Sequence, residues 1–281
     1  MTDMKIRKGP AYFVSRFVLV FLVAATFFPL LMMINMSLKK NIVIKMNFLA
    51  WPAPWEINWS NYISAWNFVK HPIWNSLLVC FASLVFIIFI VSLSGYTFGR
   101  MRFRGKELCF GLILFVLMIP YNMLLIPNYS LIRKFGLLNS YWALIIPYIA
   151  GQQIFGIVLG RAFFSSLPQE MFDAAKIDGV TEFQAYRMIA LPLSVPTLIT
   201  VGITAIVAMY NDYIWPTIVL TTGDKMKTFC QIVFNNCAGN GTSDYGMTTA
   251  AFVIGTLPLL IITVSCLRYY LQGMLAGAIK G

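Results

Sequence analysis

The sequence predicts an all-α, polytopic membrane protein with six transmembrane helices, and two observations lead to this fold class. The 281 residues are 59% hydrophobic and 11% charged, with a mean hydropathy of +0.76, whereas soluble domains are charged at about a quarter of their positions. The charges are also clustered, leaving six charge-free segments that are each longer than 20 residues. Since about 20 apolar residues cross a hydrocarbon core as a helix, each segment predicts one span. The segments are residues 17–38, 72–99, 108–132, 135–160, 188–211 and 245–267.

The first span is not expected to be a cleaved signal peptide. Its apolar run extends to Met36, which is too long for the apolar region of a signal peptide, and no small-residue cleavage pattern follows it. Six spans place both termini on one side of the membrane, and that side carries 13 of the 21 lysines and arginines against 8 on the other. The positive-inside rule therefore predicts cytoplasmic termini. Cations flanking the membrane beside anionic lipid account for the net charge of +11, so no nucleic-acid partner is expected.

The charge pattern also predicts the domain organisation. We expect residues 1–16 to form a cytoplasmic N-terminal segment and residues 17–281 to form one six-helix transmembrane domain, which includes a cytoplasmic loop at residues 165–192. After the first span, aromatic and aliphatic residues recur at helical spacing from Trp59 to Val69 beside polar ones. This pattern predicts a further helix lying along the membrane surface with its aromatic side chains at headgroup level.

Few residues are suited to metal binding or to nucleotide hydrolysis. His71 is the one histidine, and the sequence contains no Cys-x-x-Cys pattern, so we expect no metal site. Cys230 and Cys237 share one outer loop, where they could form a disulfide or remain free thiols. The sequence also contains no P-loop, because the approach to one at residues 99–107 has the wrong glycine spacing and lacks the Ser or Thr that coordinates Mg²⁺.

The loop at residues 165–192 is unusually polar for this chain and predicts two short helices. Ser166 with Gln169 and Thr181 with Gln184 each fit a capping box at a helix N-terminus. Gly179 fits the break between the two helices, since glycine readily adopts the left-handed conformation that ends a helix.

The first of these helices predicts a contact with another protein. Small residues permit close approach, and acidic residues select a basic groove on a partner. The alternative is an amphipathic loop that lies passively on the membrane. The candidate docking residues are Glu170, Asp173, Ala174, Ala175, Asp178 and Gly179.

A second candidate site lies at the end of the fifth span. Aromatic faces combined with amide and carboxylate groups are the usual means of holding a sugar, and the stretch MYNDYIW supplies them next to Pro216. The alternative is an aromatic belt at the outer interface, in which the carboxylate satisfies a break in the backbone. The candidate residues of the substrate pathway are Tyr210, Asn211, Asp212, Tyr213 and Trp215.

The polar loop also carries a recognisable motif. It reads D-A-A, three residues, Gly, nine residues, Ile-x-Leu-Pro, beginning at Asp173. This spacing resembles the EAA motif of bacterial ATP-binding-cassette (ABC) importer permeases, with Asp173 where the family usually has Glu. The stretches GYTFGRMRFRGKE, YNDYIWP and LQGMLAGAIKG are similar to the carbohydrate-importing branch, which includes the maltose-type second permease. The similarity extends from about residue 58 to residue 281, although Tyr210 replaces the usual Trp.

The resemblance implies a type I ABC importer permease fold and a transport role without catalysis by this chain. It implies a heterodimer with a second permease, two cytoplasmic ATPase subunits that bind ATP and Mg, and an extracellular or periplasmic solute-binding protein. The chain would bind no cofactor, and the EAA turn would dock in the ATPase. By the resemblance, the expected function is inward movement of a carbohydrate, in particular an oligosaccharide, through alternating access in the bacterial cytoplasmic membrane.

Two alternatives remain open from the sequence. The first is an ABC importer permease for a solute other than a sugar, because the EAA turn would be unchanged. The second is an ion-coupled secondary transporter or a membrane enzyme. Ion coupling usually requires ionisable groups deep in the membrane, and here only Asp212 lies near a span, towards its outer end.

Overall fold

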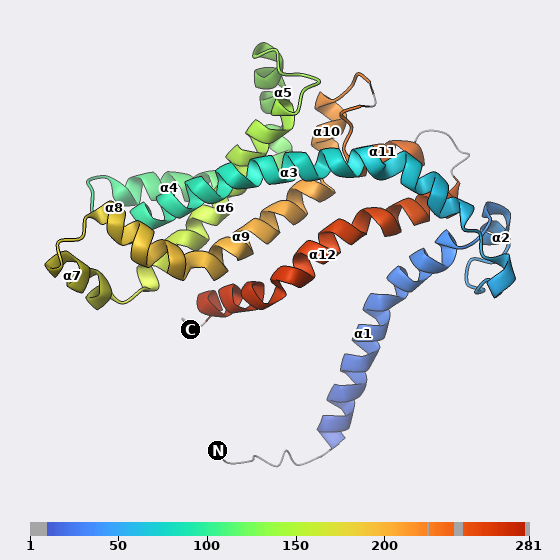
Figure 1. Ribbon diagram of the computed structural model, residues 1–281, viewed down its shortest axis with the longest axis horizontal. Coiled ribbons are helices and arrows are strands. Elements are labelled where there is room, and N and C mark those ends of the chain that lie inside the picture. Colours follow the sequence, from blue (N-terminus) through green and yellow to red (C-terminus); the bar gives the residue numbers. More distant parts are fainter. Residues whose placement is uncertain (1–9, 224, 239–243, 279–281) are drawn as a thin grey trace. The chain divides into compact units, whose positions relative to one another are not determined.

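The computed structural model describes residues 10–223, 225–238 and 244–278, and all regular structure in these ranges is helical. The prediction of an all-α fold is thus confirmed (Figure 1). The long helices are α1 (Pro10–Ser37), α3 (Ser60–Arg100), α6 (Trp142–Ser166), α9 (Leu191–Asn211) and α12 (Tyr245–Ala278). The short helices are α2 (Asn41–Met46), η1 (Pro54–Glu56), α4 (Lys106–Leu117), η2 (Tyr121–Leu124), α5 (Leu125–Lys134), α7 (Gln169–Ile177), α8 (Glu182–Ala185), η3 (Tyr186–Ala190), α10 (Ile214–Val219) and α11 (Phe229–Ala238).

Five helical segments of the described chain are long and apolar enough to cross a membrane. They are Tyr12–Ser37, Ser60–Arg100, Trp142–Ser166, Glu182–Asn211 and Tyr245–Tyr269. The number rises to six, as predicted, when the pair Lys106–Leu117 and Tyr121–Lys134 counts as one broken span. That pair is bent by 92°, so the third predicted span is not a straight helix. Pro120 lies at the break, where it offers no backbone donor and disfavours helical geometry in the residue before it.

The helix predicted after the first span is present, but it is not a separate helix. Its residues from Ser60 onward form the first turns of α3, which continues to Arg100 over 41 residues. Pro72 lies inside this helix and does not end it. At 1.5 Å per residue the helix is about 60 Å long, twice the thickness of a hydrocarbon core of about 30 Å. One continuous helix therefore replaces the predicted surface helix and second span.

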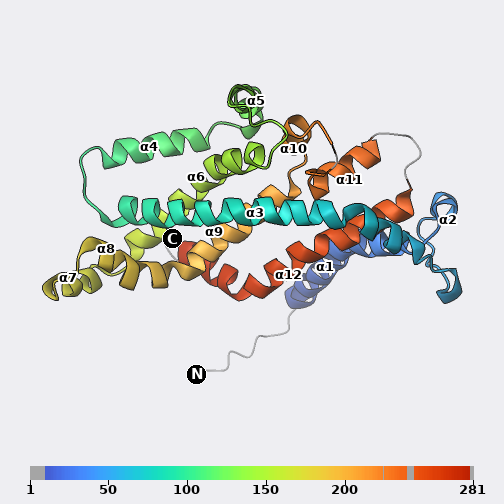
Figure 2. The ribbon, with the colours of Figure 1, turned by 45° about the horizontal axis from the view of Figure 1, so that its top comes forward.

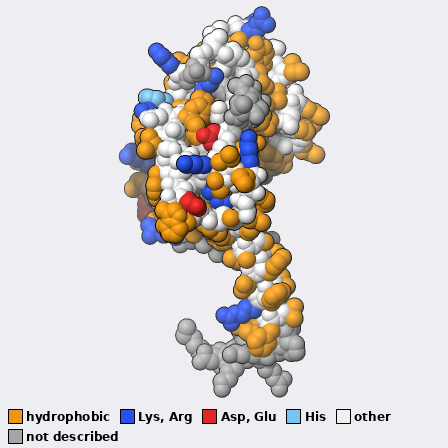
Figure 3. All heavy atoms as spheres, turned by 90° about the vertical axis from the view of Figure 1, so that its right-hand side faces the viewer, with side chains coloured by type: hydrophobic (Ala, Val, Ile, Leu, Met, Phe, Trp, Pro, Cys, Tyr) orange, Lys and Arg blue, Asp and Glu red, His pale blue; other side chains and the backbone are white. Residues whose placement is uncertain are grey.

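The described chain divides into two compact units. The first contains the residues up to Val69 together with Asn236–Thr256, and the second contains Lys70–Asn235 together with the residues from Leu257 onward. In the first unit α1 is mostly apolar, and its large side chains between Phe13 and Leu31 are exposed, whereas Asn35 and Ser37 at its end are buried (Figure 3). A helix of this kind suits a lipid environment.

Lys39 organises the chain that follows α1 in the first unit. Its side chain is 1% exposed, and its Nζ donates hydrogen bonds to the carbonyls of Asn47 at 3.3 Å and Phe48 at 2.9 Å. The amide of Asn61 donates to the carbonyls of Ser37 and Lys39 at 2.9 and 2.8 Å. Burial lowers the pKa of Lys39, whereas the carbonyls of Asn47 and Phe48 stabilise its charged form.

The second unit is built on close packing of α3, α6 and α9, which lie side by side (Figures 1 and 2). A methyl group on Gly95 would lie 3.1 Å from the backbone of Gly160, and one on Gly99 would lie 2.7 Å from Cβ of Phe164. Small residues thus let the C-terminal end of α3 approach α6 at backbone distance. This packing forms the base on which the loop after α6 rests.

Candidate functional site

The loop at residues 165–192, called the elbow from here on, contains the short helix α7 and the helix α8, and α8 continues through η3 into α9, so the second helix predicted here is not a separate short helix. Helix α7 ends at Ile177, and α8 begins at Glu182. Gly179 between them has φ of +75°, which confirms the predicted left-handed break. The capping box at Thr181 is also confirmed, because its backbone N–H donates to Gln184 Oε1 at 2.8 Å and its Oγ1 accepts from the Gln184 N–H at 3.3 Å.

The capping box predicted at Ser166 is wrong. Ser166 is still part of α6, and its hydroxyl donates to the carbonyl of Phe163 at 2.7 Å. Helix α7 begins at Gln169 with Pro168 in the capping position. Proline disfavours helical geometry in the residue before it, so Leu167 is extended and separates the two helices.

The structure places five of the six candidate docking residues on the exposed surface of the elbow. These are Glu170, Asp173, Ala174, Asp178 and Gly179, whereas Ala175 is 7% exposed and packs inside the chain. Asp173 accepts a hydrogen bond from the amide of Gln169 at 2.8 Å. Sequence reasoning missed Ile177, which is 88% exposed beside these carboxylates. The elbow thus presents acidic groups next to one apolar side chain.

The elbow packs on the membrane helices through a buried aromatic cluster. The cluster consists of Tyr96, Phe164, Phe172, Ala185, Tyr186 and Ala190. The ring centroid of Tyr96 lies 5.3 Å from that of Tyr186 and 5.8 Å from that of Phe164, the latter in an edge-on arrangement. Since aromatic pairs of this kind are favourable and bury a large area, they hold the elbow against α3 and α6.

Two of the five candidate pathway residues are part of the protein core. Tyr210 is 2% exposed and stacks on Phe229 with ring centroids 5.7 Å apart. Trp215 is fully buried, and its Nε1 donates to the carbonyl of Ala143 at 2.9 Å. Trp215 therefore positions α10 against α6, and Tyr210 joins α9 to α11.

Asp212 lies at the break between α9 and α10. Its Oδ1 accepts hydrogen bonds from the backbone N–H groups of Ile214 at 3.0 Å and Trp215 at 3.2 Å, and its Oδ2 accepts one from the hydroxyl of Tyr148 at 3.0 Å. A carboxylate in this role satisfies donors that a helix start leaves unpaired. This is the geometry that the alternative interpretation of the MYNDYIW stretch describes.

Asn211, Asp212 and Tyr213 line a cavity of about 440 Å³, which is the size of a small-molecule site. Sequence reasoning missed the polar residues that α6 and η2 add to it, which include Tyr121, Asn122, Tyr148 and Gln152. The signal that could have found them is the pair of prolines at 120 and 147, since Pro120 lies at the break before η2 and Pro147 lies within α6 and lines this cavity. Amide, phenol and carboxylate groups of this set can bind hydroxyl groups.

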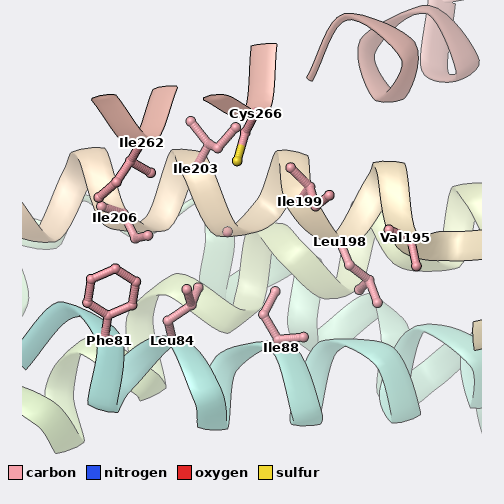
Figure 4. A pocket seen from close by; sticks show the side chains of 11 residues that line it. Phe81, Leu84, Ile88, Val195, Leu198, Ile199, Ile203, Ile206, Ile262 and Cys266 are labelled. Carbon is pink, nitrogen blue, oxygen red and sulfur yellow. The ribbon is translucent and has the colours of Figure 1, made fainter. Parts of the chain in front are cut away.

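A second cavity of about 390 Å³ has a different chemistry. It lies between α3, α9 and the second half of α12, with side chains such as Leu84, Ile203 and Ile262 directed into it (Figure 4). Apart from the thiol of Cys266, the labelled side chains carry no polar atom. This cavity offers almost no hydrogen bonds to a polar solute, so the first cavity is the candidate site.

Two expectations concern metals and disulfides. Among the residues that the structure describes, no three His, Cys, Asp or Glu side chains are grouped for metal binding. Cys230 is a free thiol in the structure, as in the second of the two alternatives, and the side chain of Cys237 lies outside the described residues.

Comparison with known proteins identifies similar chains. The sequence model of the family described as "binding-protein-dependent transport system inner membrane component" matches residues 92–275. The chain is 32% identical over 268 residues to the probable ABC transporter permease protein YurM of Bacillus subtilis, which covers 94% of this chain and 87% of that protein. It is 33% identical over 207 residues to the lactose transport system permease protein LacG of Rhizobium radiobacter, covering 74% of each chain.

The fold agrees with these relationships. A solved bacterial ABC transporter involved in the import of the acidic polysaccharide alginate contains a chain that superposes with a TM-score of 0.80 at 21% identity, covering 96% of this chain and all of that one. The arabinooligosaccharides transport system permease protein AraQ of Halalkalibacterium halodurans is 31% identical over 77% of this chain and 75% of its own length. The chain therefore belongs to the family of binding-protein-dependent transport system inner membrane components, the ABC transporter permeases.

Proposed function

We propose that the chain is the membrane-spanning permease subunit of an ABC importer that moves a carbohydrate, in particular an oligosaccharide, into the cell. The exposed elbow carries this proposal, because a rigid acidic helix-turn-helix beside apolar spans is suited to contact with another protein. The substrate class is supported by relatives that are named for lactose and for arabinooligosaccharides. In this proposal the chain transports and does not catalyse.

The elbow is proposed to dock in a separate cytoplasmic ATPase. Its carboxylates at Glu170, Asp173 and Asp178 suit a basic groove, and the exposed Ile177 suits an apolar contact within that groove. Ala174 and Gly179 add no bulk at the same surface, while Ala175 supports it from inside. ATP and Mg would bind to the ATPase, since the sequence of this chain contains no P-loop.

Transport is proposed to proceed by alternating access. Two ATPase subunits would close on ATP and move the docked elbows, and this chain would rock against a second, homologous permease in the cytoplasmic membrane with both termini inside. A solute-binding protein outside the membrane would deliver the carbohydrate. Charged groups in the spans would not drive transport, since Asp212 is committed to the α10 backbone and to Tyr148.

The cavity beside Asp212 is proposed to be this chain's part of the substrate pathway. It lies where the break before η2, the break between α9 and α10, and the part of α6 that contains Pro147 converge, and interrupted membrane helices often form substrate sites. Asn211, Asp212 and Tyr213 reach it directly, whereas Tyr210 and Trp215 support it from the core. The second permease would complete the site.

A crosslinking experiment in the whole transporter tests the coupling. Asp173→Cys and Ile177→Cys variants of the complex, reconstituted in liposomes, should each crosslink to the ATPase subunit, whereas Arg104→Cys, which is exposed but outside the elbow, should crosslink far less. Uptake that continues without any capture of an ATPase would contradict the proposal. ATPase stimulation by candidate sugars, set against amino acids and polyols, decides between a carbohydrate and another polar solute.

A further inference from the structure

We infer that α3 transmits the movement of the elbow into the membrane, and that Ser92, Tyr96 and Arg100 are the positioning residues of this joint. The inference rests on the proposed function only in that it takes the elbow as the contact with the ATPase. Beyond the proposed function, the inference names α3 as the helix that receives the force and names the three side chains that connect α3 to the elbow.

The three residues form a single stripe on α3. They lie at positions i, i+4 and i+8 of a helix, which places their side chains on one face. Each of the three contacts a different part of the elbow. A stripe with this spacing therefore binds the elbow along three turns of α3.

Arg100 connects α3 to the start of α7. Its guanidinium carbon lies 3.9 Å from the centre of the Phe172 ring, and Phe172 is only 5% exposed. Its Nη1 donates a hydrogen bond of 3.1 Å to the carbonyl of Leu167, two residues before α7 begins. A cation over a buried ring and a charge-assisted hydrogen bond are both strengthened by partial burial, so Arg100 orients α7 relative to α3.

Tyr96 and Ser92 connect α3 to α8 and η3. The hydroxyl of Tyr96 donates to Oε2 of Glu182 at 3.3 Å, and Glu182 also forms an ion pair of 3.4 Å with Lys176 of α7. The hydroxyls of Ser92 and Tyr186 are hydrogen-bonded at 2.9 Å in a buried position. The contact between Tyr96 and Glu182 therefore connects α3 to both α7 and α8.

The neighbouring stripe of α3 fixes the helix to α6. Gly95 and Gly99 directly precede Tyr96 and Arg100, and a methyl group would lie 3.1 Å from the Gly160 backbone at Gly95 and 2.7 Å from Cβ of Phe164 at Gly99, so the first position is tight and the second has no room for it. One face of the end of α3 thus packs against α6, and the adjacent face is hydrogen-bonded to the elbow. It cannot slide away from the elbow without losing both contacts.

This arrangement matters for force transmission because of how the elbow is attached. Helix α7 is joined to α6 through the extended Leu167 and to α8 through the turn at Gly179, whereas α8, η3 and α9 form one continuous helical segment from Glu182 to Asn211. A helix held at two such points can pivot about the line that joins them, and contacts of α7 with α3 remove this freedom. Loss of the stripe should therefore leave docking intact but let the elbow pivot when the ATPase moves.

The test measures solute transported per ATP hydrolysed by the complete transporter in liposomes. Arg100→Ala should lower this ratio about fivefold or more, the scale of an allosteric coupling energy. ATPase activity and the crosslink from Ile177→Cys should persist. Arg102→Ala and Arg104→Ala remove exposed arginines in the loop that follows α3, and both should leave the ratio unchanged.

A double variant distinguishes positioning from general loss of stability. If Arg100 acts through the Phe172 ring, Arg100→Ala combined with Phe172→Leu should lower the ratio no further than the more severe single variant. Tyr96→Phe keeps the ring packing and removes only the hydrogen bond to Glu182, so it should fold normally and show a smaller drop.

The outcomes separate the inference from the proposed function. A normal ratio in both Arg100→Ala and Tyr96→Phe, with the elbow still crosslinked to the ATPase, overturns the inference and leaves the proposed function standing. Failure of the elbow to crosslink in the unmodified background overturns the proposed function instead. If Arg100→Ala does not assemble, Tyr96→Phe alone decides.

Discussion

The hydroxyl of Tyr148 donates a 3.0 Å hydrogen bond to Oδ2 of Asp212, while Oδ1 of the same carboxylate accepts from the first N–H groups of α10. One side chain therefore joins α6 to the break after α9. Because each carboxylate oxygen has a defined donor, Asp212 is held in place and lines the polar cavity with a fixed acceptor.

Replacing Asp212 should destabilise the second unit. Asp212→Ala leaves two backbone donors and the Tyr148 hydroxyl without their acceptor, and loss of such a cap typically costs about 1 kcal/mol or more. Asp212→Asn retains one acceptor oxygen and should cost less. Thermal unfolding in detergent measures both variants, with Asn211→Ala as the control because its amide bonds only to Val207 of its own helix. Equal melting temperatures for Asp212→Ala and the unmodified protein would contradict this role.

A branched side chain at Gly179 should uncouple transport. Gly179 has φ of +75° and open space around it, so Gly179→Val meets no steric neighbour and acts only through backbone strain. The left-handed conformation costs such a residue about 1 to 2 kcal/mol. We expect uptake to fall more than the amount of protein in the membrane, measured by transport and immunoblotting.

Two further variants serve as controls for this prediction. Gly111→Val adds the same side chain where space is equally open and φ is not positive, so it should be tolerated. Gly179→Asn should retain most uptake, because asparagine adopts the left-handed region more readily than valine. Similar losses in all three variants would show that the conformation of Gly179 is not the cause.

A methyl group at Gly99 should separate α3 from α6. It would lie 2.7 Å from Cβ of Phe164 and 3.2 Å from the carbonyl of Arg161, and neither atom is the free end of a flexible side chain. Overpacking of this kind typically costs about 1 to 3 kcal/mol. Gly99→Ala should lower the melting temperature, whereas Gly111→Ala should not, since nothing lies within 4 Å of that position. A stable Gly99→Ala protein would show that the two helices can separate at little cost.

The amides of Asn122 and Gln152 should contribute to solute binding. Both line the polar cavity, where their amides can donate and accept hydrogen bonds. Loss of one hydrogen bond to a sugar costs about 1 kcal/mol, which corresponds to a roughly fivefold change in affinity. Asn122→Ala and Gln152→Ala should raise the KM for uptake by about this factor, with basal ATPase activity preserved. Cys266→Ala, in the apolar cavity, should leave the KM unchanged. If Cys266→Ala raised the KM as much as the two amide variants do, the polar cavity would not be the solute site.

The elbow could largely be predicted because its signals are local. The capping box at Thr181 and the left-handed Gly179 depend on neighbours within three residues, and both are formed. The box at Ser166 failed because Pro168 imposes an extended conformation on Leu167, which outweighs the weak preference of a serine for a helix start. The surface helix failed for a related reason, since amphipathic spacing indicates a helix but does not indicate where it ends.

The candidate substrate residues show where local signals end. Tyr210 and Trp215 carry the same chemistry as Tyr213, yet they are buried against Phe229 and Ala143, which belong to distant parts of the sequence. Conversely, the prolines at 120 and 147 mark the region of Asn122 and Gln152 in the sequence, but only the packing of the helices shows that these two side chains line the same cavity.

The sequence by itself determined the helical class, the apolar spans and the geometry of the elbow turn, because hydropathy, helix capping and glycine conformation act over a few residues along the chain. Only the tertiary structure decided which face of each helix is buried, how Ser92, Tyr96 and Arg100 of α3 meet the elbow, and which polar groups share a cavity. These relationships depend on the packing of helices far apart in sequence, which is selected by the shape of whole surfaces and not by any single segment.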